Sequence, residues 1–237
     1  ISGSITGNFA FTATDGTIAL TGTSPQTIGP GIFTGNTINS LIINNPAGVT
    51  LTGSLGVSGV VLVQNGTLAS DGHLTLLSDA SGTALVDGSG NGNITGDVTM
   101  QRYLASAYGY KYFSSPFSDA TVSEFGDDMN LASSFPLFYR YDENRTSSGW
   151  VGYSTGTNIL AAMAGYAVNF GAEDVAKTVD VTGEVNNGNL SVTLYNHNRA
   201  FTKGFNLVGN PYPSPIDWDA STGWTRANVD DAVYYFR

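Results

Sequence analysis

Short apolar runs separated by glycine, asparagine and aspartate make up most of the chain. No long window places apolar residues at the i, i+3, i+4 and i+7 positions of an amphipathic helix. Short runs rich in Val, Ile and Leu that end at turn residues predict β-strands. In the first hundred residues the predicted strands are Thr17–Leu20, Ser40–Ile43, Val49–Thr52, Val60–Val63, His73–Leu77 and Ile94–Met100. The pattern therefore predicts an all-β protein.

The spacing of these strands is too short for helical crossovers. The segment from Asn39 to Ser78 reads as a degenerate repeat, in which apolar residues recur every few positions with Gly or Asn at the corners. This is typical of a β-solenoid, whose coils each supply two or three short strands. At roughly 20 residues or a little more per coil, residues 1–101 would form about four or five coils. A narrow interior favours ladders of Val, Ile and Leu over aromatic rings.

The composition of the chain changes after Met100, where aromatic and basic residues appear together. The strands predicted in this part are Leu137–Tyr141, Trp150–Ser154, Gly165–Phe170, Thr178–Val185, Leu190–Tyr195, Gly204–Gly209 and Ala232–Phe236. Strands of this number with aromatic residues for a core favour an antiparallel sandwich. We therefore expect a short β-solenoid over residues 1–101, followed by an antiparallel β-sandwich over residues 102–237.

Two hairpins are predicted in the second part. Asn186–Asn189 contains an Asn-Gly step and is expected to join the strand Thr178–Val185 to the strand Leu190–Tyr195. Asp142–Gly149 is expected to form a second hairpin loop. The sequence stops at Arg237 inside an apolar run with no turn after it, so we expect the natural chain to continue.

Charge is distributed as unevenly as the aromatic residues. All nine Lys and Arg follow residue 101, as do 24 of the 27 aromatic residues, while the first 101 residues carry five aspartates as their only charges. The net charge of −10 argues against nucleic-acid binding, which needs a basic face. A polysaccharide lyase site on the solenoid is disfavoured because its chemistry needs a basic residue. The longest apolar run, Ile159–Val168, is far short of the ~20 residues that cross a bilayer.

The loop that contains Asp142, Glu143 and Asn144 gathers oxygen side chains that are able to hold Ca²⁺. The spacing of an EF-hand is missing, and a solvated hairpin tip is the alternative. The Gly-rich segment Gly88–Asn93 lacks the strand-to-helix context of a dinucleotide loop, and we expect it to be a corner loop. Calcium is therefore the only ion considered, and no other cofactor is expected.

Four aromatic residues of the second part are candidates for stacking on sugar rings: Trp150, Tyr212, Trp218 and Trp224. The alternative is that they pack in the core and in turns, which is the usual role of large aromatic side chains. His73 and His197 lie without His or Cys partners at metal-ligand spacing, and we expect surface roles for both. No Gly-x-Ser-x-Gly elbow is present, and no pair of carboxylates stands out as a glycosidase pair.

The chain resembles large secreted, adhesin-like surface proteins of Bacteroidota-type bacteria in three stretches, TINSLIINNPAGVTLTGSLGVSGVVLVQNGTLASDGHLTLLS (37–78), GDVTMQRYLASAYGYKYFSSPFS (96–118) and GFNLVGNPYPSPIDW (204–218). The first is similar to their repetitive region and the others to the module that follows it. Such proteins usually end in a sorting domain for type IX secretion, which is not recognisable up to Arg237. The resemblance implies an extracellular, surface-associated protein without catalytic residues.

Two functions from different classes are expected. The first is a non-enzymatic structural or adhesive segment that binds cell-surface components or assembles with copies of itself. A solenoid is stiff, and its ends expose strand edges that must be capped, covered or joined. We expect the sandwich to cover the C-terminal end. The alternative is a carbohydrate-binding module that uses the exposed aromatic residues of the second part, with or without calcium.

Overall fold

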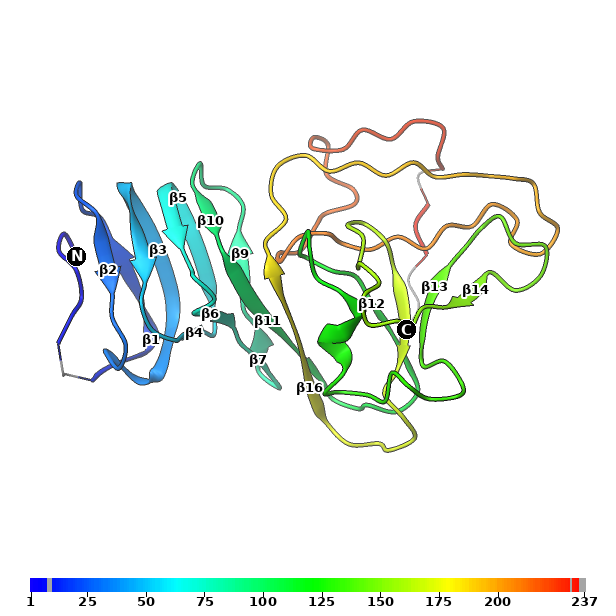
Figure 1. Cartoon of the computed structure of the whole chain (residues 1–237). Coiled ribbons are helices and arrows are strands. Elements are labelled where there is room, and N and C mark those ends of the chain that lie inside the picture. The colour runs from blue at the N-terminus through cyan, green and yellow to red at the C-terminus, as the bar shows by residue number, and fades with distance from the viewer. Residues whose placement is uncertain (8–9, 231, 235–237) are drawn as a thin grey trace.

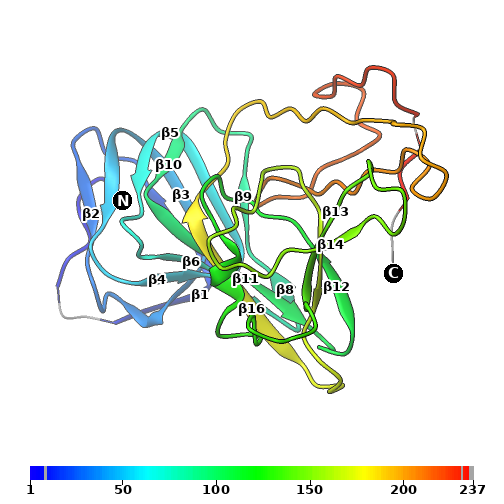
Figure 2. The same cartoon turned by 45° about the vertical axis from the view of Figure 1, so that its right-hand side comes forward.

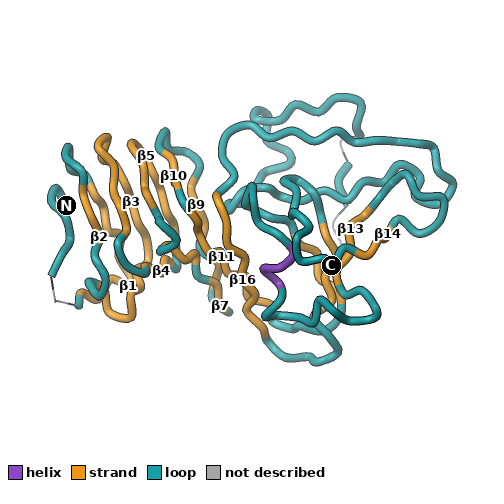
Figure 3. The backbone as a smooth tube through the Cα atoms, viewed as in Figure 1, coloured by secondary structure: helices purple, strands orange, loops and turns teal. Residues whose placement is uncertain are grey.

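The computed structural model describes residues 1–7, 10–230 and 232–234 of the chain. The fold is all-β, with about 42% strand and about 2% helix. A β-solenoid of roughly four turns forms the first part, as predicted, and a less regular part follows it (Figure 1). Loops make up most of this second part, whereas strands dominate the solenoid (Figure 3).

The six predicted strands of the solenoid fall on observed ones, but two of them belong to one long strand, Phe33–Leu51, and five further short strands were not predicted. The observed strands are β1 (Phe11–Leu20), β2 (Gln26–Ile28), β3 (Phe33–Leu51), β4 (Leu55–Val57), β5 (Val60–Ala69), β6 (Leu74–Leu76), β7 (Ser78–Asp79), β8 (Gly82–Thr83), β9 (Leu85–Asp87), β10 (Asn93–Thr95) and β11 (Asp97–Leu104). The predicted strand Ile94–Met100 is divided at Gly96, whose φ of 75° turns the chain between β10 and β11.

Parallel pairing stacks the coils along three faces, and the two views of the ribbon show the strands side by side (Figures 1 and 2). Face A pairs Ile18 with Leu41, Leu41 with Val61 and Val61 with Val86. Face B stacks Gln26, Val49, Leu68 and Ile94. Face C stacks Ile38, Val57, Leu76 and Met100. Val49, Leu68 and Ile94 are 19 and 26 residues apart, so the coil length varies around the expected value.

Aliphatic ladders fill the interior of the solenoid. The aliphatic residues with 0% exposure there are Leu20, Ile38, Leu41, Ile43, Leu51, Val57, Val61, Leu68, Leu74, Leu76, Ala84 and Val98. Full burial of one Val, Leu or Ile side chain contributes about 1.5–3 kcal/mol. Val, Ile and Leu therefore dominate the interior, as expected, although one aromatic ring, that of Phe33, is buried there as well.

Two buried amide side chains satisfy the backbone at one corner of the coils. Asn45 donates from Nδ2 to the carbonyl of Ser24 at 2.8 Å and to Oε1 of Gln26 at 2.9 Å. Gln26 donates from Nε2 to the carbonyl of Gly3 at 2.6 Å. Both side chains are almost fully buried, and their hydrogen bonds offset the cost of removing them from water.

The segment Gly88–Asn93 is a corner loop, as expected. Its backbone lies directly on the preceding coil, where Gly92 donates to the carbonyl of Val63 at 2.9 Å. A Cβ at Gly90 would lie 2.0 Å from that same carbonyl oxygen. Close backbone packing therefore explains Gly90 and Gly92, whereas Gly88 has open space around it.

The second part contains β12 (Tyr110–Phe113), η1 (Val122–Phe125), β13 (Phe138–Tyr141), β14 (Trp150–Gly152), β15 (Tyr166–Asn169) and β16 (Lys177–Glu184). Four of these strands form an antiparallel sheet in the order β12-β15-β13-β14. The predicted hairpin at Asp142–Gly149 is confirmed, since Tyr141 pairs with Trp150 across it. Phe113, Phe125 and Phe138 pack edge to face beneath this sheet, with centroid distances of 5.6 and 5.2 Å.

The other predicted hairpin is wrong. β16 pairs antiparallel with β11, the last strand of the solenoid, and the Thr99 and Thr182 hydroxyls meet at 2.9 Å. The exposed edge of the solenoid is an extended partner for the whole of β16, whereas Leu190–Tyr195 forms no strand.

The sandwich is not confirmed. Gly204–Gly209 supplies only an isolated bridge at Val208, and of the other strands described in the second part four form β12-β15-β13-β14 while β16 joins the solenoid sheet. The predicted strand Ala232–Phe236 lies partly outside the described residues, and its described part forms no strand. The boundary between residues 101 and 102 stays a prediction, since β11 runs across it.

The second part of the chain covers all three faces at the C-terminal end of the solenoid. On face A, Val86 of β9 donates its backbone N–H to the carbonyl of Pro213 at 2.9 Å. On face B, the Asn187 side chain donates to Oδ1 of Asn93 in β10 at 2.7 Å. On face C, β16 covers β11 along its length. The solenoid end is therefore closed by segments from three places in the chain.

Candidate functional site

An aromatic hollow lies on the outer face of the four-stranded sheet. It has a volume of about 420 Å³ and is lined by Tyr110, Tyr112, Tyr139, Ser148, Trp150 and Ala167, and we call it the tyrosine groove. In strands, alternate side chains share a face. Tyr110 and Tyr112 therefore lie outward on β12, while Phe113 packs inward. Ala167 pairs with Tyr112 on one side and with Tyr139 on the other, so that a small residue lies between two rings.

Ring contacts hold the groove in shape. Tyr110 packs against Tyr139 at 6.0 Å, and Trp150 lies between Tyr112 at 6.1 Å and Tyr141 at 5.2 Å. Burial raises the pKa of Tyr139, and the neighbouring Tyr110 hydroxyl raises it further. The Tyr139 phenol is therefore a neutral hydrogen-bonding group at physiological pH.

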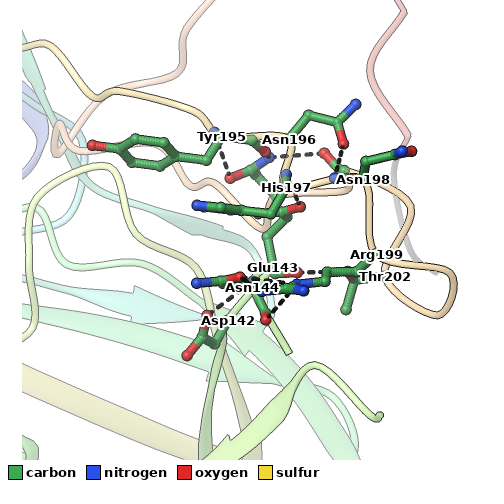
Figure 4. A network of polar contacts seen from close by, with 11 residues as sticks. Asp142, Glu143, Asn144, Tyr195, Asn196, His197, Asn198, Arg199 and Thr202 are labelled. Atoms are coloured by element: carbon green, nitrogen blue, oxygen red, sulfur yellow. Dashed lines mark hydrogen bonds and ion pairs between the residues drawn. The ribbon is translucent and has the colours of Figure 1, made fainter. Parts of the chain in front are cut away.

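A polar network joins the β13–β14 hairpin to the loop around residue 197 (Figure 4). We call its five residues, Glu143, Asn144, His197, Arg199 and Thr202, the hairpin clasp. Glu143 Oε2 lies 2.6 Å from Nδ1 of His197, and Oε1 accepts from the His197 backbone N–H at 2.8 Å. Arg199 donates from Nη2 to Oδ1 of Asn144 at 2.7 Å. The clasp fixes the hairpin that carries Ser148 and Trp150, two residues of the groove.

The Glu143 carboxylate is the electrostatic centre of the clasp. Its side chain is only 5% exposed. The hydrogen bond from His197 is the main cause that lowers the pKa of Glu143, although burial acts in the opposite direction. His197 was expected to have a plain surface role. That expectation is revised, because its ring lies against a carboxylate 54 residues away in the chain.

A lowered pKa makes the clasp sensitive to acid. The ionised Glu143 stabilises the fold fully above its unfolded pKa near 4.5, and this contribution is lost as the pH falls through the lower, folded pKa. We expect Glu143→Gln to reduce the melting temperature at pH 7. The difference should shrink progressively as the pH falls below 4.5, because the contribution of the ionised carboxylate is then gradually lost.

Thermal unfolding of both proteins from pH 7 to pH 3 checks this expectation. Glu173→Gln is the control, because Glu173 is an exposed acid on a loop, and it should leave the melting temperature unchanged at every pH. A gap between Glu143→Gln and wild type that stays constant down to pH 3 would contradict the assignment.

The predicted calcium ligands do not converge on a common point. Glu143 faces His197, the Asn144 amide oxygen faces Arg199, and Asp142 accepts from the Asn144 backbone N–H at 3.1 Å. The oxygens that a metal ion would need are thus already paired with side-chain or backbone nitrogen atoms. Among the described residues, no group of three or more His, Cys, Asp or Glu side chains is placed to hold a metal ion.

The predicted aromatic residues fall into separate places. Trp150 lines the groove. Trp218 and Trp224 pack on each other at 5.0 Å, and Arg226 lies 5.0 Å from the Trp218 ring centre. The Tyr212 hydroxyl donates to the carbonyl of Gly188 at 2.7 Å, next to the segment that covers the solenoid end. Trp224 Nε1 likewise donates to a backbone carbonyl, that of Asp217. Tyr212 and Trp224 therefore both hold the backbone of the chain in place.

Acidic side chains cover the outer edge of β16, the edge that faces away from β11. Glu124 Oε2 accepts the backbone N–H of Thr182 at 3.1 Å, and Asp119 Oδ1 accepts that of Glu184 at 2.8 Å. Gly183 makes this approach possible, because a Cβ there would lie 2.5 Å from Asp119 Oδ1. The last strand thus presents carboxylates in place of unpaired N–H groups, which is one way to prevent strand addition.

A buried ion pair anchors the same edge. Lys177 Nζ lies 2.9 Å from Oδ1 of Asp128, whose side chain is 9% exposed. Burial raises the pKa of Asp128, and Lys177 opposes this shift. The pair ties the loop after η1 to the start of β16.

Sequence reasoning missed the tyrosines of the groove. Tyr110 and Tyr112 alternate with Lys111 and Phe113, a period of two that predicts an amphipathic strand, but this stretch was not assigned as one. The same period in Tyr139 and Tyr141 could have been combined with it. The clasp had no local signal, because its two halves lie more than fifty residues apart.

The comparisons with known proteins identify a family. Residues 12–237 match the model of a family described as a domain of unknown function, DUF8693. No curated protein and no solved structure matches the chain. No helix among the described residues is long and apolar enough to span a membrane. The family match covers nearly the whole sequence, solenoid and second part together, and the chain therefore belongs to the DUF8693 family.

Proposed function

We propose that the chain is a non-enzymatic structural and adhesive segment of a bacterial extracellular surface protein. The observation that carries this proposal is the closed end of the solenoid, where contacts on faces A, B and C fix the second part of the chain to a stiff coil. Such a coil holds the aromatic sheet away from its N-terminal end. The resemblance of residues 37–78, 96–118 and 204–218 to secreted surface proteins supports a location outside the cell, reached by type IX secretion.

A structural role also accounts for the most conspicuous acid–base pair. Glu143 and His197 hold each other through two hydrogen bonds, and the carboxylate is nearly buried. A catalytic acid or base must reach a substrate. The His197 side chain is 41% exposed, but both hydrogen bonds between His197 and Glu143 join two loops, a role that needs no substrate.

Association of like copies enters the proposal through strand edges. The acids on β16 protect one end of the solenoid, so that assembly by strand pairing is directed to the opposite end. There the Ile1 amino group donates to the carbonyl of Ala19 and Ile5 pairs with Ile28, so the edge that remains for pairing among the described residues is the earlier part of β1.

We expect the double variant Asp119→Ala, Glu124→Ala to expose the N–H groups of Thr182 and Glu184. The exposed N–H groups are then able to pair with a strand of another copy. The variant should therefore associate at concentrations at which the wild type does not.

Sedimentation velocity over a range of concentrations measures this effect. The matched control is Glu173→Ala, Asp174→Ala, which removes the same charge from two exposed acids of a loop. If the control associates as strongly as the edge variant, the cause is net charge and the edge-protection argument fails.

The proposed function itself is tested by retention under flow. Beads that carry the folded chain through its N-terminal end are passed over a layer of bacterial cells, beside beads that carry heat-unfolded chain. The proposal expects retention of the folded chain only, and no turnover of neutral or acidic polysaccharides. Equal loss of both kinds of bead, or measurable turnover, would overturn it.

A further inference from the structure

The tyrosine groove has the chemistry of a sugar site. Its lining residues comprise three tyrosines, one tryptophan, one serine and one alanine, and none of them is charged. Tyr110 and Tyr112 are 45% and 44% exposed. Ring faces of this kind pack against the C–H faces of a pyranose, while the phenol, indole and serine groups are hydrogen-bonding partners for its hydroxyls.

We infer that the tyrosine groove binds a neutral oligosaccharide. This inference rests on the proposed function and names the ligand class behind the adhesion. The volume of about 420 Å³ lies at the lower end of the ~300–1,000 Å³ typical of ligand sites, which suits a short stretch of a glycan chain.

The charges of the protein favour a neutral glycan over an acidic one as the ligand of the groove. None of the lining side chains is a cation for a uronate or sulfate, and Arg145 beside the groove is engaged through its Nε with the carbonyl of Ser148 at 3.1 Å. The chain carries a net charge of −10, which repels polyanions.

The groove is also organised before any ligand arrives. Tyr139 is held by the ring of Tyr110, and Trp150 by the ring of Tyr141. The hairpin clasp holds the backbone that carries Trp150. Rings that are already fixed lose little conformational freedom on binding, which favours affinity.

Isothermal titration calorimetry on the full chain tests the inference. The ligands are neutral hexasaccharides of gluco, manno, galacto and xylo configuration, and an oligogalacturonate is the acidic comparison. We expect binding of at least one neutral member and none of the acidic one. Trp150→Ala should weaken that binding at least tenfold. Tyr110→Ala, which removes an exposed ring, serves as a second variant in case Trp150→Ala disturbs the sheet.

Trp224→Ala is the matched control, because it removes a tryptophan that packs on Trp218 outside the lining of the groove. The inference is overturned if no neutral hexasaccharide binds, or if Trp224→Ala weakens binding as much as Trp150→Ala does. Bead retention that persists without any glycan binding, or in Trp150→Ala, leaves the adhesive function standing and removes only the sugar assignment. Loss of all bead retention removes the adhesive function, whatever the titration shows.

Discussion

Gly66→Ala is expected to abolish the native fold or to destabilise it by more than about 4 kcal/mol, which is an exceptional loss for a single methyl group. Gly66 has a φ of 84°, and a Cβ there would lie 1.9 Å from the carbonyl oxygen of Asn45. The side chain of Asn45 is itself fully buried and donates a hydrogen bond to Oε1 of Gln26. The coil has no room to move away, because moving it breaks these bonds.

Gly72→Ala separates the two causes of this effect. Gly72 has a similar φ of 75°, but nothing lies within 4 Å of its Cβ position. The left-handed backbone alone should cost about 1–2 kcal/mol. Urea unfolding followed by circular dichroism measures both variants, and equal losses would show that the contact between coils at Gly66 is not as tight as described.

Leu41→Ala is expected to destabilise the fold by about 2–5 kcal/mol. Leu41 has 0% exposure and lies in the middle of face A, between Ile18 and Val61 of the neighbouring coils. Truncation removes contacts to the coils on both sides and leaves a cavity that a regular stack cannot collapse to fill. In a stacked fold, stability depends on such contacts between nearest neighbours.

Ser54→Ala is the control for this measurement. Ser54 is exposed on the surface of the same stack, and its loss should change the free energy of unfolding by no more than about 0.5 kcal/mol. Urea unfolding of both variants gives the comparison. A loss below about 1 kcal/mol for Leu41→Ala would mean that face A is loosely packed, and the account of the aliphatic ladder would be wrong.

The solenoid could be predicted because its signals are local and repeated. Each coil places aliphatic residues inward and small residues at corners, so one coil read from the sequence describes the next. The six strands expected before residue 101 all lie on observed strands. Glycines such as Gly66 and Gly90 were recognised as corner residues, but the contacts that require them became visible only with the neighbouring coils in place.

The second part was harder to predict because its strands pair with distant partners. The Asn-Gly step at 187–188 is a strong hairpin signal, yet β16 pairs with β11. The end of the solenoid already offered an open edge, and the pairing of eight residues there outweighs a local turn. The predicted sandwich depended on that hairpin and on strands that the structure does not form.

By itself, the sequence determined an all-β chain, a solenoid with an aliphatic interior and a change in character near residue 101, because composition and short-range periodicity are local properties. Only the tertiary structure decided which groups meet across long separations. These are β16 on β11, Glu143 beside His197, and Tyr110 with Tyr139 and Trp150 around one groove. The physical reason is that residues brought together by a long loop share no local sequence pattern. Their pairing is determined by complementary strand edges, charges and ring faces.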